Sequence, residues 1–373
     1  MSSYKNIKNI DDESMRLRVT DKLLTLRKQL NEEIPGKTAT ETLLLATWNI
    51  REFGDNRLEE SCYYIAEIID HFDMVVLQEV NSKALQGLKS VMSILGDNWT
   101  YIMSDGVEGS AGGNEAMAFV FNTNKVQFTG LCGEIVLPFE KLIQTTRKKK
   151  KDGVKVDETT SVQFARTPYM ASFRAGWFDF NLCTVHIYYG DDSSDEKTDD
   201  GSIKRRLDEI KAITSALLKK QDEDGNSYII LGDFNIPDTQ GEYFNALVQS
   251  QKFKKKTSRF FIPEELRNYP TDMKQESHYD QIAFCVNLED NMTIFDEKEQ
   301  KAGAFNFTKS VYGEDEWAEY LPYYKAAYED SKKNKTEASH YSLWRTFQMS
   351  DHMPLWVELK IDFSDQYLKT HTK

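Results

Sequence analysis

One arrangement of apolar runs occurs twice in the chain and constrains the fold more than any other feature. Each copy has two near-continuous apolar runs, at residues 43–50 and 73–80 in the first and at 180–187 and 228–235 in the second. Such runs predict strands covered on both faces. The stretch between the runs has apolar residues at helical spacing, which predicts a crossover helix in each copy. The chain is therefore expected to be an α/β protein whose sheets are covered by helices.

Further segments complete this outline. Strands are predicted within residues 116–122, 168–180, 278–286 and 351–359, and a helix is predicted over 13–33, where Met15, Val19, Leu23, Leu26 and Leu30 repeat at helical spacing before Pro35-Gly36. No linker composition interrupts the pattern. We therefore expect an N-terminal helical extension over 1–40, one domain over 41–362 and a C-terminal tail over 363–373.

Three stretches are interpreted as additions to this core. Residues 147–158 are predicted to be a charged loop and residues 191–201 an acidic loop. The segment 300–349 is rich in Tyr, Trp and Lys. Its aromatic residues are interpreted mainly as core or cover, and a wall of the substrate pocket is the alternative.

Five short signatures lie at ends of the predicted strands, and each contains a carboxylate, an amide or an imidazole. They are TWNIREFG (47–54), VLQEV (76–80), TVHIYYG (184–190), LGDFNIP (231–237) and SDHMP (350–354). Polar groups at the carboxyl ends of strands are where α/β proteins build their sites. A hard cation such as Mg²⁺ takes oxygen ligands, and attack on phosphorus needs a base and charge stabilisation. The set therefore indicates a divalent-metal hydrolase with its site in one cleft.

The five signatures and their order resemble those of the endonuclease/exonuclease/phosphatase superfamily, over roughly residues 43–360. Its members include deoxyribonuclease I, repair nucleases, bacterial sphingomyelinases and inositol polyphosphate 5-phosphatases. The closest likeness in motifs is to deoxyribonuclease I. The resemblance implies a four-layer α/β sandwich of two mostly antiparallel sheets flanked by helices. It also implies hydrolysis of a phosphodiester, with a phosphomonoester as the alternative, by means of Mg²⁺ or Mn²⁺; Ca²⁺ is a possible structural ion.

The resemblance also implies roles for individual residues. Glu79, Asn49 and Asp351 match the metal-binding group. Asp233 and Asn235 match the pair that orients the nucleophile and binds the phosphate, and His186 and His352 match the two imidazoles beside it. Asp280 is similar to the carboxylate partner of His352, and Glu115 to that of His186. Arg51 and Arg166 match arginines that contact substrate phosphates.

Each of these residues also has an ordinary interpretation. An Asp–Asn turn is common after a strand, the histidines can be structural, Asp280 can simply begin a strand, and Glu115 follows a loop-like GGN. Arg51 and Arg166 can be ion-pair residues. Together, five signatures in order favour the catalytic interpretation over these alternatives.

Three substrate classes remain open. DNA ranks first because of the WNIR, QEV and HYDQI segments. A lipid headgroup or small nucleotide ranks second, because the chain carries a net charge of −13 and an aromatic-rich insertion, whereas DNA binding usually needs a basic surface. A non-catalytic relative ranks third. Asn81 stands where deoxyribonuclease I has an arginine that contacts DNA, and that enzyme's disulfide cysteines are absent.

The expected environment follows from weaker signals. The four cysteines form no C-x-x-C pair and are expected to be mainly buried, reduced thiols. No signal-peptide core and no membrane span are found. A cytoplasmic location is therefore expected, and the sequence indicates no protein partner.

Overall fold

The strands form two large sheets in the computed structural model, which describes residues 4–106, 114–151, 154–190, 202–254, 256–288, 293–296, 298–299, 301–330 and 336–372. The six-stranded sheet has the order β14 (Ala302–Ala304), β15 (Leu355–Lys360), β1 (Thr42–Phe53), β2 (Met74–Asn81), β4 (Glu115–Asn122), β3 (Trp99–Met103). The five-stranded sheet has the order β13 (Asp280–Cys285), β10 (Tyr228–Asp233), β9 (Phe178–His186), β8 (Tyr169–Ala175), β5 (Val126–Glu134). A small pair, β11 (Gln251–Lys252) and β12 (Thr257–Ser258), lies apart from both.

The repeated pattern in the sequence becomes the centre of each sheet. The pair β1–β2 is parallel and is joined through α2 (Glu59–Asp70). The pair β9–β10 is also parallel and is joined through α4 (Ser202–Asp224). The other pairings in the two large sheets are antiparallel. Two mostly antiparallel sheets flanked by helices were predicted, and the structure confirms them.

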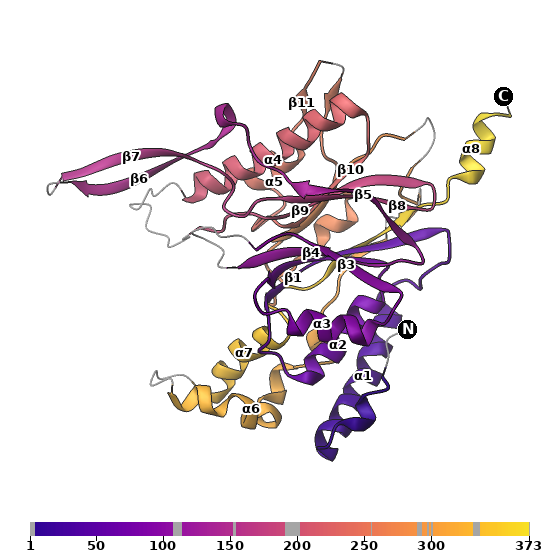
Figure 1. Cartoon of the computed structure of the whole chain (residues 1–373), viewed down its shortest axis with the longest axis vertical. Helices are drawn as coiled ribbons and strands as arrows, with labels where there is room; N and C mark the ends of the chain where they lie inside the picture. The colour runs from indigo at the N-terminus through magenta and orange to yellow at the C-terminus, as the bar shows by residue number, and fades with distance from the viewer. Residues whose placement is uncertain are drawn as a thin grey trace.

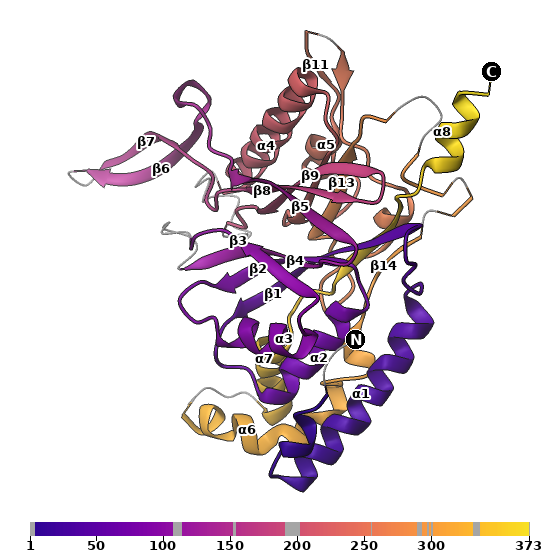
Figure 2. The same cartoon turned by 45° about the vertical axis from the view of Figure 1, so that its right-hand side comes forward.

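The elements stack in four layers, which Figures 1 and 2 show from two directions. The helices α4 and α5 (Glu242–Val248) cover the outer face of the five-stranded sheet. Below the six-stranded sheet lie α1 (Glu13–Glu33), α2, α3 (Gln86–Leu95), α6 (Trp317–Asp330) and α7 (Glu337–Gln348). One apolar cluster fills the space between the sheets and under α4, and a second lies between the six-stranded sheet and the lower helices.

The first helix matches the predicted residues 13–33 and packs against the lower layer. Its side chains Val19, Leu23, Leu26 and Leu30 are buried in the same cluster as Trp48 of β1. Its N-cap is Asp12, whose carboxylate accepts a hydrogen bond from Met15 N. The division of the chain at residue 40 stays a prediction, and the last residues include a short helix, α8 (Ser364–Thr370).

The prediction of a charged loop at 147–158 is wrong. Residues in this range belong to a long antiparallel hairpin of β6 (Ile143–Lys151) and β7 (Val154–Val162), which extends away from the sandwich in Figure 1. The lysine run led to the loop prediction, although β-branched residues alternate before it at Ile143 and Thr145 and after it at Val154 and Val156. An Asp-Gly dipeptide between such stretches is a hairpin signal. The acidic stretch 191–201 lies outside the described residues.

The aromatic-rich segment 300–349 is mainly core, as predicted. Tyr312, Tyr320, Tyr324 and Tyr341 are buried in the lower apolar cluster with Trp344 packed against them. Short 3₁₀ turns, η4 (Phe307–Lys309) and η5 (Glu314–Glu316), lead into α6 and α7. Elsewhere the described residues include the 3₁₀ turns η1 (Ile7–Asn9), η2 (Phe139–Lys141) and η3 (Glu265–Asn268). The end of this segment reaches the candidate site described next, through Phe347.

All four cysteines are free thiols, and all but Cys132 are buried, which agrees with the expectation from the sequence. Burial raises the pKa of Cys62 and of Cys285 to about 11, so both are protonated at neutral pH. Among the described residues, no helix is both long enough and apolar enough to cross a lipid bilayer.

Candidate active site

The candidate site lies where the carboxyl ends of the two parallel strand pairs meet. On the five-stranded sheet, Asp233 at the end of β10 is in register with His186 of β9 on one side and with Asp280 of β13 on the other. Residues in register on neighbouring strands point to the same face of a sheet. The strand pairing thus brings together three residues that are far apart in the sequence.

Asp233 is the centre of this arrangement. Its Oδ2 lies 3.5 Å from Nε2 of His186 and 3.8 Å from Nε2 of His352. The same oxygen accepts a hydrogen bond of 3.0 Å from Nδ2 of Asn49, which comes from the other sheet. Asp233 is 1% exposed, so its carboxylate forms the floor of the site between the two imidazoles.

His352 is held by a buried carboxylate. Its Nδ1 lies 2.7 Å from Oδ2 of Asp280. Burial alone would lower the pKa of His352, but the charges of Asp280 and Asp233 raise it well above its ordinary value. The main chain is also fixed, because Trp48 Nε1 donates to His352 O at 2.9 Å and His352 N donates to Ser350 Oγ at 2.9 Å. The ring is therefore oriented with Nε2 toward Asp233.

His186 faces a second carboxylate on its other side. Its Nδ1 lies 3.2 Å from Oε2 of Glu115, at the start of β4. Glu115 also accepts hydrogen bonds from Arg166, through Nε to Oε2 and through Nη2 to Oε1 at 3.2 Å. Burial alone would raise the pKa of Glu115, but His186 and Arg166 together lower it to about 2. Arg166 thus pairs with Glu115, as in the ion-pair interpretation of this arginine from the sequence.

The predicted metal group lies at the rim on the six-stranded sheet. Oε1 of Glu79 accepts from Asn49 Nδ2 at 2.9 Å, and Oε2 accepts from Glu52 N at 2.9 Å. Asp351 forms an ion pair with Arg51, with 2.5 Å between Oδ2 and Nη1. The side chain of Asp351 is 40% exposed, whereas that of Glu79 is 18% exposed.

These donors fit one kind of metal and not another. In the described part of the chain, no three His, Cys, Asp or Glu side chains gather as a ready cage for an ion, which argues against a closed zinc-type site. Mg²⁺ is usually held by one or two carboxylates and keeps several waters. Glu79, a partly exposed carboxylate with the amide N–H of Asn49 on one oxygen, suits that hydrated type of site.

The backbone around the site is unusual. Arg51 and Glu52 both have φ of 44°, Glu79 has 60° and Asn235 has 53°. Both β1 and β2 have register irregularities here, between Asn49 and Phe53 and between Leu77 and Val80. Left-handed conformations in non-glycine residues cost free energy and are concentrated at functional sites. The strands are thus bent where the polar residues leave them.

Asn235 is fixed behind the floor. Its backbone N donates to Asp233 Oδ1 at 2.8 Å, and its side-chain Nδ2 donates to Ile187 O at 2.7 Å. The preceding Gly232 has φ of 132°, and a Cβ there would lie 2.1 Å from Val185 O. The Gly-Asp-Phe-Asn sequence is thus required by close contact with β9 as well as by the polar side chains.

A family model described as "Endonuclease/Exonuclease/phosphatase family" matches residues 46–271, more than half of the chain. The chain belongs to this family. The match covers most of β1 and all of β2, β9 and β10, and it contains eight of the eleven predicted site residues; Asp280, Asp351 and His352 lie beyond its end. Members of the family are hydrolases that act on phosphoester bonds.

Solved structures of other proteins resemble this member of the family at low sequence identity. A mannosyl-6-phosphatase of Bacteroides thetaiotaomicron shares 16% identity over 85% of this chain and 99% of its own, with a TM-score of 0.47. TDP2 of D. rerio, complexed with a single-strand DNA product, shares 14% identity over 85% and 98%, with a TM-score of 0.47. The human Nocturnin catalytic domain shares 12% identity over 85% and 94%, with a TM-score of 0.43. The curated protein sequences give no match.

Several residues around the site were missed in the sequence. Arg57 and Arg206 donate to main-chain carbonyls of the site segments. Phe347, at the end of α7, lies under Arg51, with 4.3 Å between the guanidinium carbon and the ring centroid. Tyr279 lies beside His352, with 5.6 Å between ring centroids. Of these residues, only Tyr279 could have been found from the sequence, because it lies in the HYDQIAF segment next to Asp280. The others come near the site through contacts between distant parts of the chain.

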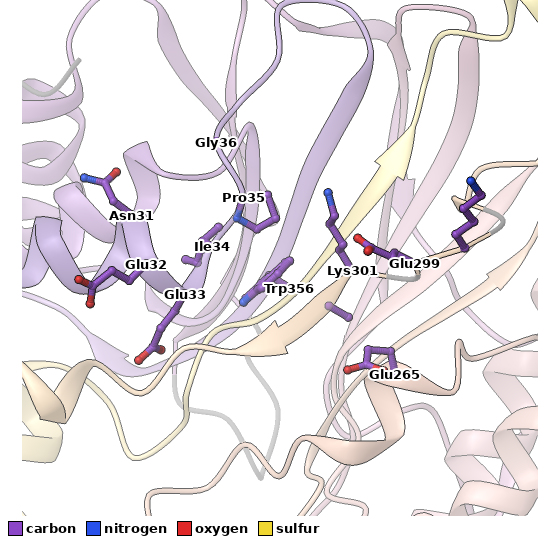
Figure 3. A pocket seen from close by; sticks show the side chains of 12 residues that line it. Asn31, Glu32, Glu33, Ile34, Pro35, Gly36, Glu265, Glu299, Lys301 and Trp356 are labelled. Carbon is purple, nitrogen blue, oxygen red and sulfur yellow. The ribbon is translucent and has the colours of Figure 1, made fainter.

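A separate hollow of about 710 Å³ lies between the end of α1 and the edge of the six-stranded sheet (Figure 3). Its lining includes Glu33, Glu265, Glu299, Lys301 and Trp356. None of the predicted site residues lines it. The candidate active site therefore stays the cluster of polar side chains around Asp233.

Proposed function

We propose that this chain is a divalent-metal-dependent phosphodiester hydrolase. The observation that carries the proposal is the position of Asp233, whose Oδ2 lies within 4 Å of Nε2 of both His186 and His352. Each imidazole has a carboxylate at its other nitrogen. A carboxylate between two oriented imidazoles can direct a water at phosphorus and supply protons to its oxygens.

The proposed roles follow from the geometry. Asp233 orients the attacking water and accepts its proton. His352, kept protonated by Asp280, can pass the proton on Nε2 to the departing oxygen. His186 stabilises the charge that develops on the other phosphate oxygens, and so does Asn235 through the Nδ2 hydrogen that it does not donate to Ile187 O. Arg166 supports the His186–Glu115 pair from behind.

Glu79 would hold Mg²⁺ or Mn²⁺, with Asn49 beside it and Asp351 available after it separates from Arg51. When bound, such an ion neutralises phosphate charge and lowers the pKa of a coordinated water. The chain's own contribution is to fix Glu79 by the amide of Asn49 and the N–H of Glu52. Arg51, once free of Asp351, can contact a substrate phosphate from its stacked position over Phe347.

DNA is the substrate class we propose first, cut endonucleolytically. The motif likeness to deoxyribonuclease I supports it, and so does the hairpin β6–β7, whose sequence carries Arg147 and four consecutive lysines in a chain of net charge −13. A concentrated basic arm can contact phosphates although the whole chain is acidic. The four free thiols fit the cytoplasmic location proposed with this function.

A phosphodiester in a lipid headgroup is the second candidate. The segment leading into the hairpin exposes apolar side chains, with Leu131 56%, Val136 63% and Phe139 87% exposed. Exposed apolar residues next to basic ones favour contact with an anionic membrane surface. Nothing comparable favours a small soluble nucleotide.

One experiment separates the two candidates. Supercoiled plasmid is incubated with the protein and Mg²⁺ or Mn²⁺, in parallel with vesicles containing sphingomyelin or a phosphoinositide, and nicking and headgroup release are measured. We expect nicking, abolished by chelation. Intact plasmid with headgroup release would replace DNA by lipid, and no hydrolysis of either under any divalent metal would contradict the proposed function.

A further inference from the structure

A partly buried arginine donates hydrogen bonds to main-chain carbonyls of two separate segments of the candidate site, the end of β1 and the residues before Asp351. Arg57, just before α2, donates through Nη2 to Ile50 O, to Arg51 O at 2.9 Å and to Met349 O at 3.1 Å, and through Nη1 to Glu52 O at 3.2 Å. The end of β1, which carries Asn49 and Arg51, is thereby joined to the segment that carries Asp351 and His352.

The second half of the site has a counterpart. Arg206, near the start of α4, is 2% exposed and donates to Tyr188 O through Nε at 3.3 Å, to Asn235 O through Nη1 at 3.1 Å and to Tyr189 O through Nη2. It therefore joins the segment after His186 to the segment after Asp233. The guanidinium also lies over the ring of Tyr189, 5.0 Å from its centroid.

The two arginines occupy equivalent places in the two halves. Each follows the first strand of a parallel pair and lies at or near the start of its crossover helix, α2 or α4. Each donates to carbonyls at or just after the end of that strand and to one carbonyl of a second segment, Met349 O for Arg57 and Asn235 O for Arg206. A planar guanidinium with five N–H groups can bind several carbonyls in one fixed geometry, which a lysine cannot do.

The segments that they bind are strained. Arg51 and Glu52, whose carbonyls Arg57 binds, are in the left-handed region, and so is Asn235, whose carbonyl Arg206 binds. Left-handed non-glycine residues persist only where their surroundings hold them in place. The hydrogen bonds from the arginines, together with those that Asn49, Glu79 and Asp233 accept from the same segments, oppose relaxation of these segments.

We propose that Arg57 and Arg206 are a matched pair of positioning residues. Arg57 sets the end of β1 and the segment before Asp351, which carry proposed metal ligands, and Arg206 sets the segments that follow His186 and Asp233. Neither touches the reacting atoms. The inference deepens the proposed hydrolase function and rests on it, and it assigns a different consequence to the loss of each arginine.

The test compares Arg57→Met, Arg206→Met and both lysine variants with Arg18→Met. Arg18 is a control arginine of α1 that is largely buried and whose printed hydrogen bonds go to the side chains of Glu60 and Tyr323. Mn²⁺ affinity is measured by electron paramagnetic resonance without substrate, and kcat and KM are measured on the substrate of the wild type. We expect Arg57→Met to weaken Mn²⁺ binding about tenfold or more, and Arg206→Met to keep Mn²⁺ affinity but lower kcat about tenfold or more.

Compared with the methionine variants, both lysine variants should recover stability more than activity, because a point charge cannot bind several carbonyls at fixed angles. If a methionine variant fails to fold, the corresponding lysine variant is measured in its place. Equal behaviour of both arginine variants and Arg18→Met, or parallel loss of Mn²⁺ affinity and kcat in both, would overturn the proposal. The wild type could also hydrolyse no phosphoester while Arg57→Met is the one variant that loses Mn²⁺ affinity. That result would contradict the proposed function but would retain the metal-positioning role of Arg57. A wild type that binds no Mn²⁺ would contradict both.

Discussion

Gln78 and Thr184 join the two sheets directly behind the site, with Gln78 Nε2 donating to Thr184 Oγ1 at 3.0 Å. Both residues are fully buried. Gln78 precedes Glu79 on β2, and Thr184 lies two residues before His186 on β9. The same Nε2 lies 3.1 Å from Thr47 Oγ1 on β1. This contact joins the strand that carries Glu79 to the strand that carries His186.

Replacing Gln78 with Leu should therefore affect stability and activity together. Two buried threonine hydroxyls would lose a partner, which costs about 1–3 kcal/mol each. Urea unfolding of Gln78→Leu, Thr184→Val and the double variant measures the coupling. We expect the double variant to lose clearly less than the sum of the single losses. Strict additivity would show that the hydrogen bond does not couple the sheets.

Asp233→Asn should abolish turnover and leave the fold intact. The amide cannot accept a proton from the attacking water, and we expect kcat to fall about 10³-fold or more. Steady-state kinetics and circular dichroism check this. Asp238→Asn, an exposed aspartate in the following turn, is the control and should be unaffected. Near-normal turnover in Asp233→Asn would remove it from the centre of the mechanism.

Glu79→Gln should change the metal dependence. The amide keeps the size of the side chain but removes the rim carboxylate, so we expect the Mg²⁺ concentration for half-maximal rate to rise about tenfold or more. A Mg²⁺ titration of the rate measures this. The exposed neighbour Glu52, which contacts Glu79 through its backbone N–H, provides the control Glu52→Gln. An unchanged titration would place the ion elsewhere.

Glu115 should make stability depend on acidic pH. Its pKa is lowered from 4.5 to about 2 in the folded chain. The stabilisation is therefore fully present above pH 4.5 and is lost as pH falls from 4.5 toward 2; it amounts to at most about 3 kcal/mol. The difference in unfolding free energy between wild type and Glu115→Gln should be largest near pH 6 and roughly half as large or less at pH 3. A difference that does not vary with pH would contradict the ion pair with Arg166.

Gly232→Ala should be among the most destabilising single substitutions. The new Cβ would meet Val185 O at 2.1 Å, and the glycine φ of 132° is strained for any other residue. We expect a loss of about 3 kcal/mol or more. Gly96, with φ of 86° and nothing within 4 Å of a Cβ, is the matched control. Gly96→Ala should lose only the backbone strain, on the order of 1–3 kcal/mol, and therefore less than Gly232→Ala, which adds the contact with Val185. Equal losses in thermal unfolding would show that backbone contact at β9 is unimportant.

Elements defined by local periodicity were predicted well from the sequence. The helix over residues 13–33, the two strand–helix–strand copies and the polar residues at their strand ends all follow from apolar spacing within short windows. That each strand pair is parallel was found only in the structure. The hairpin β6–β7 was missed because its charges concealed the strand pattern. The segment 300–349 was correctly assigned to the core, but its contact with the site through Phe347 was not foreseen.

The sequence by itself determined the family, the fold class and which side chains could perform phosphoester chemistry, because strand ends and ordered motifs are local features. The tertiary structure alone decided how these side chains are held. Glu115 reaches His186 from another sheet, Arg51 pairs with Asp351 across 300 positions, and Arg57 binds carbonyls on both sides of that pair. Such contacts depend on how distant strands register and bend, and no short stretch of sequence contains that information.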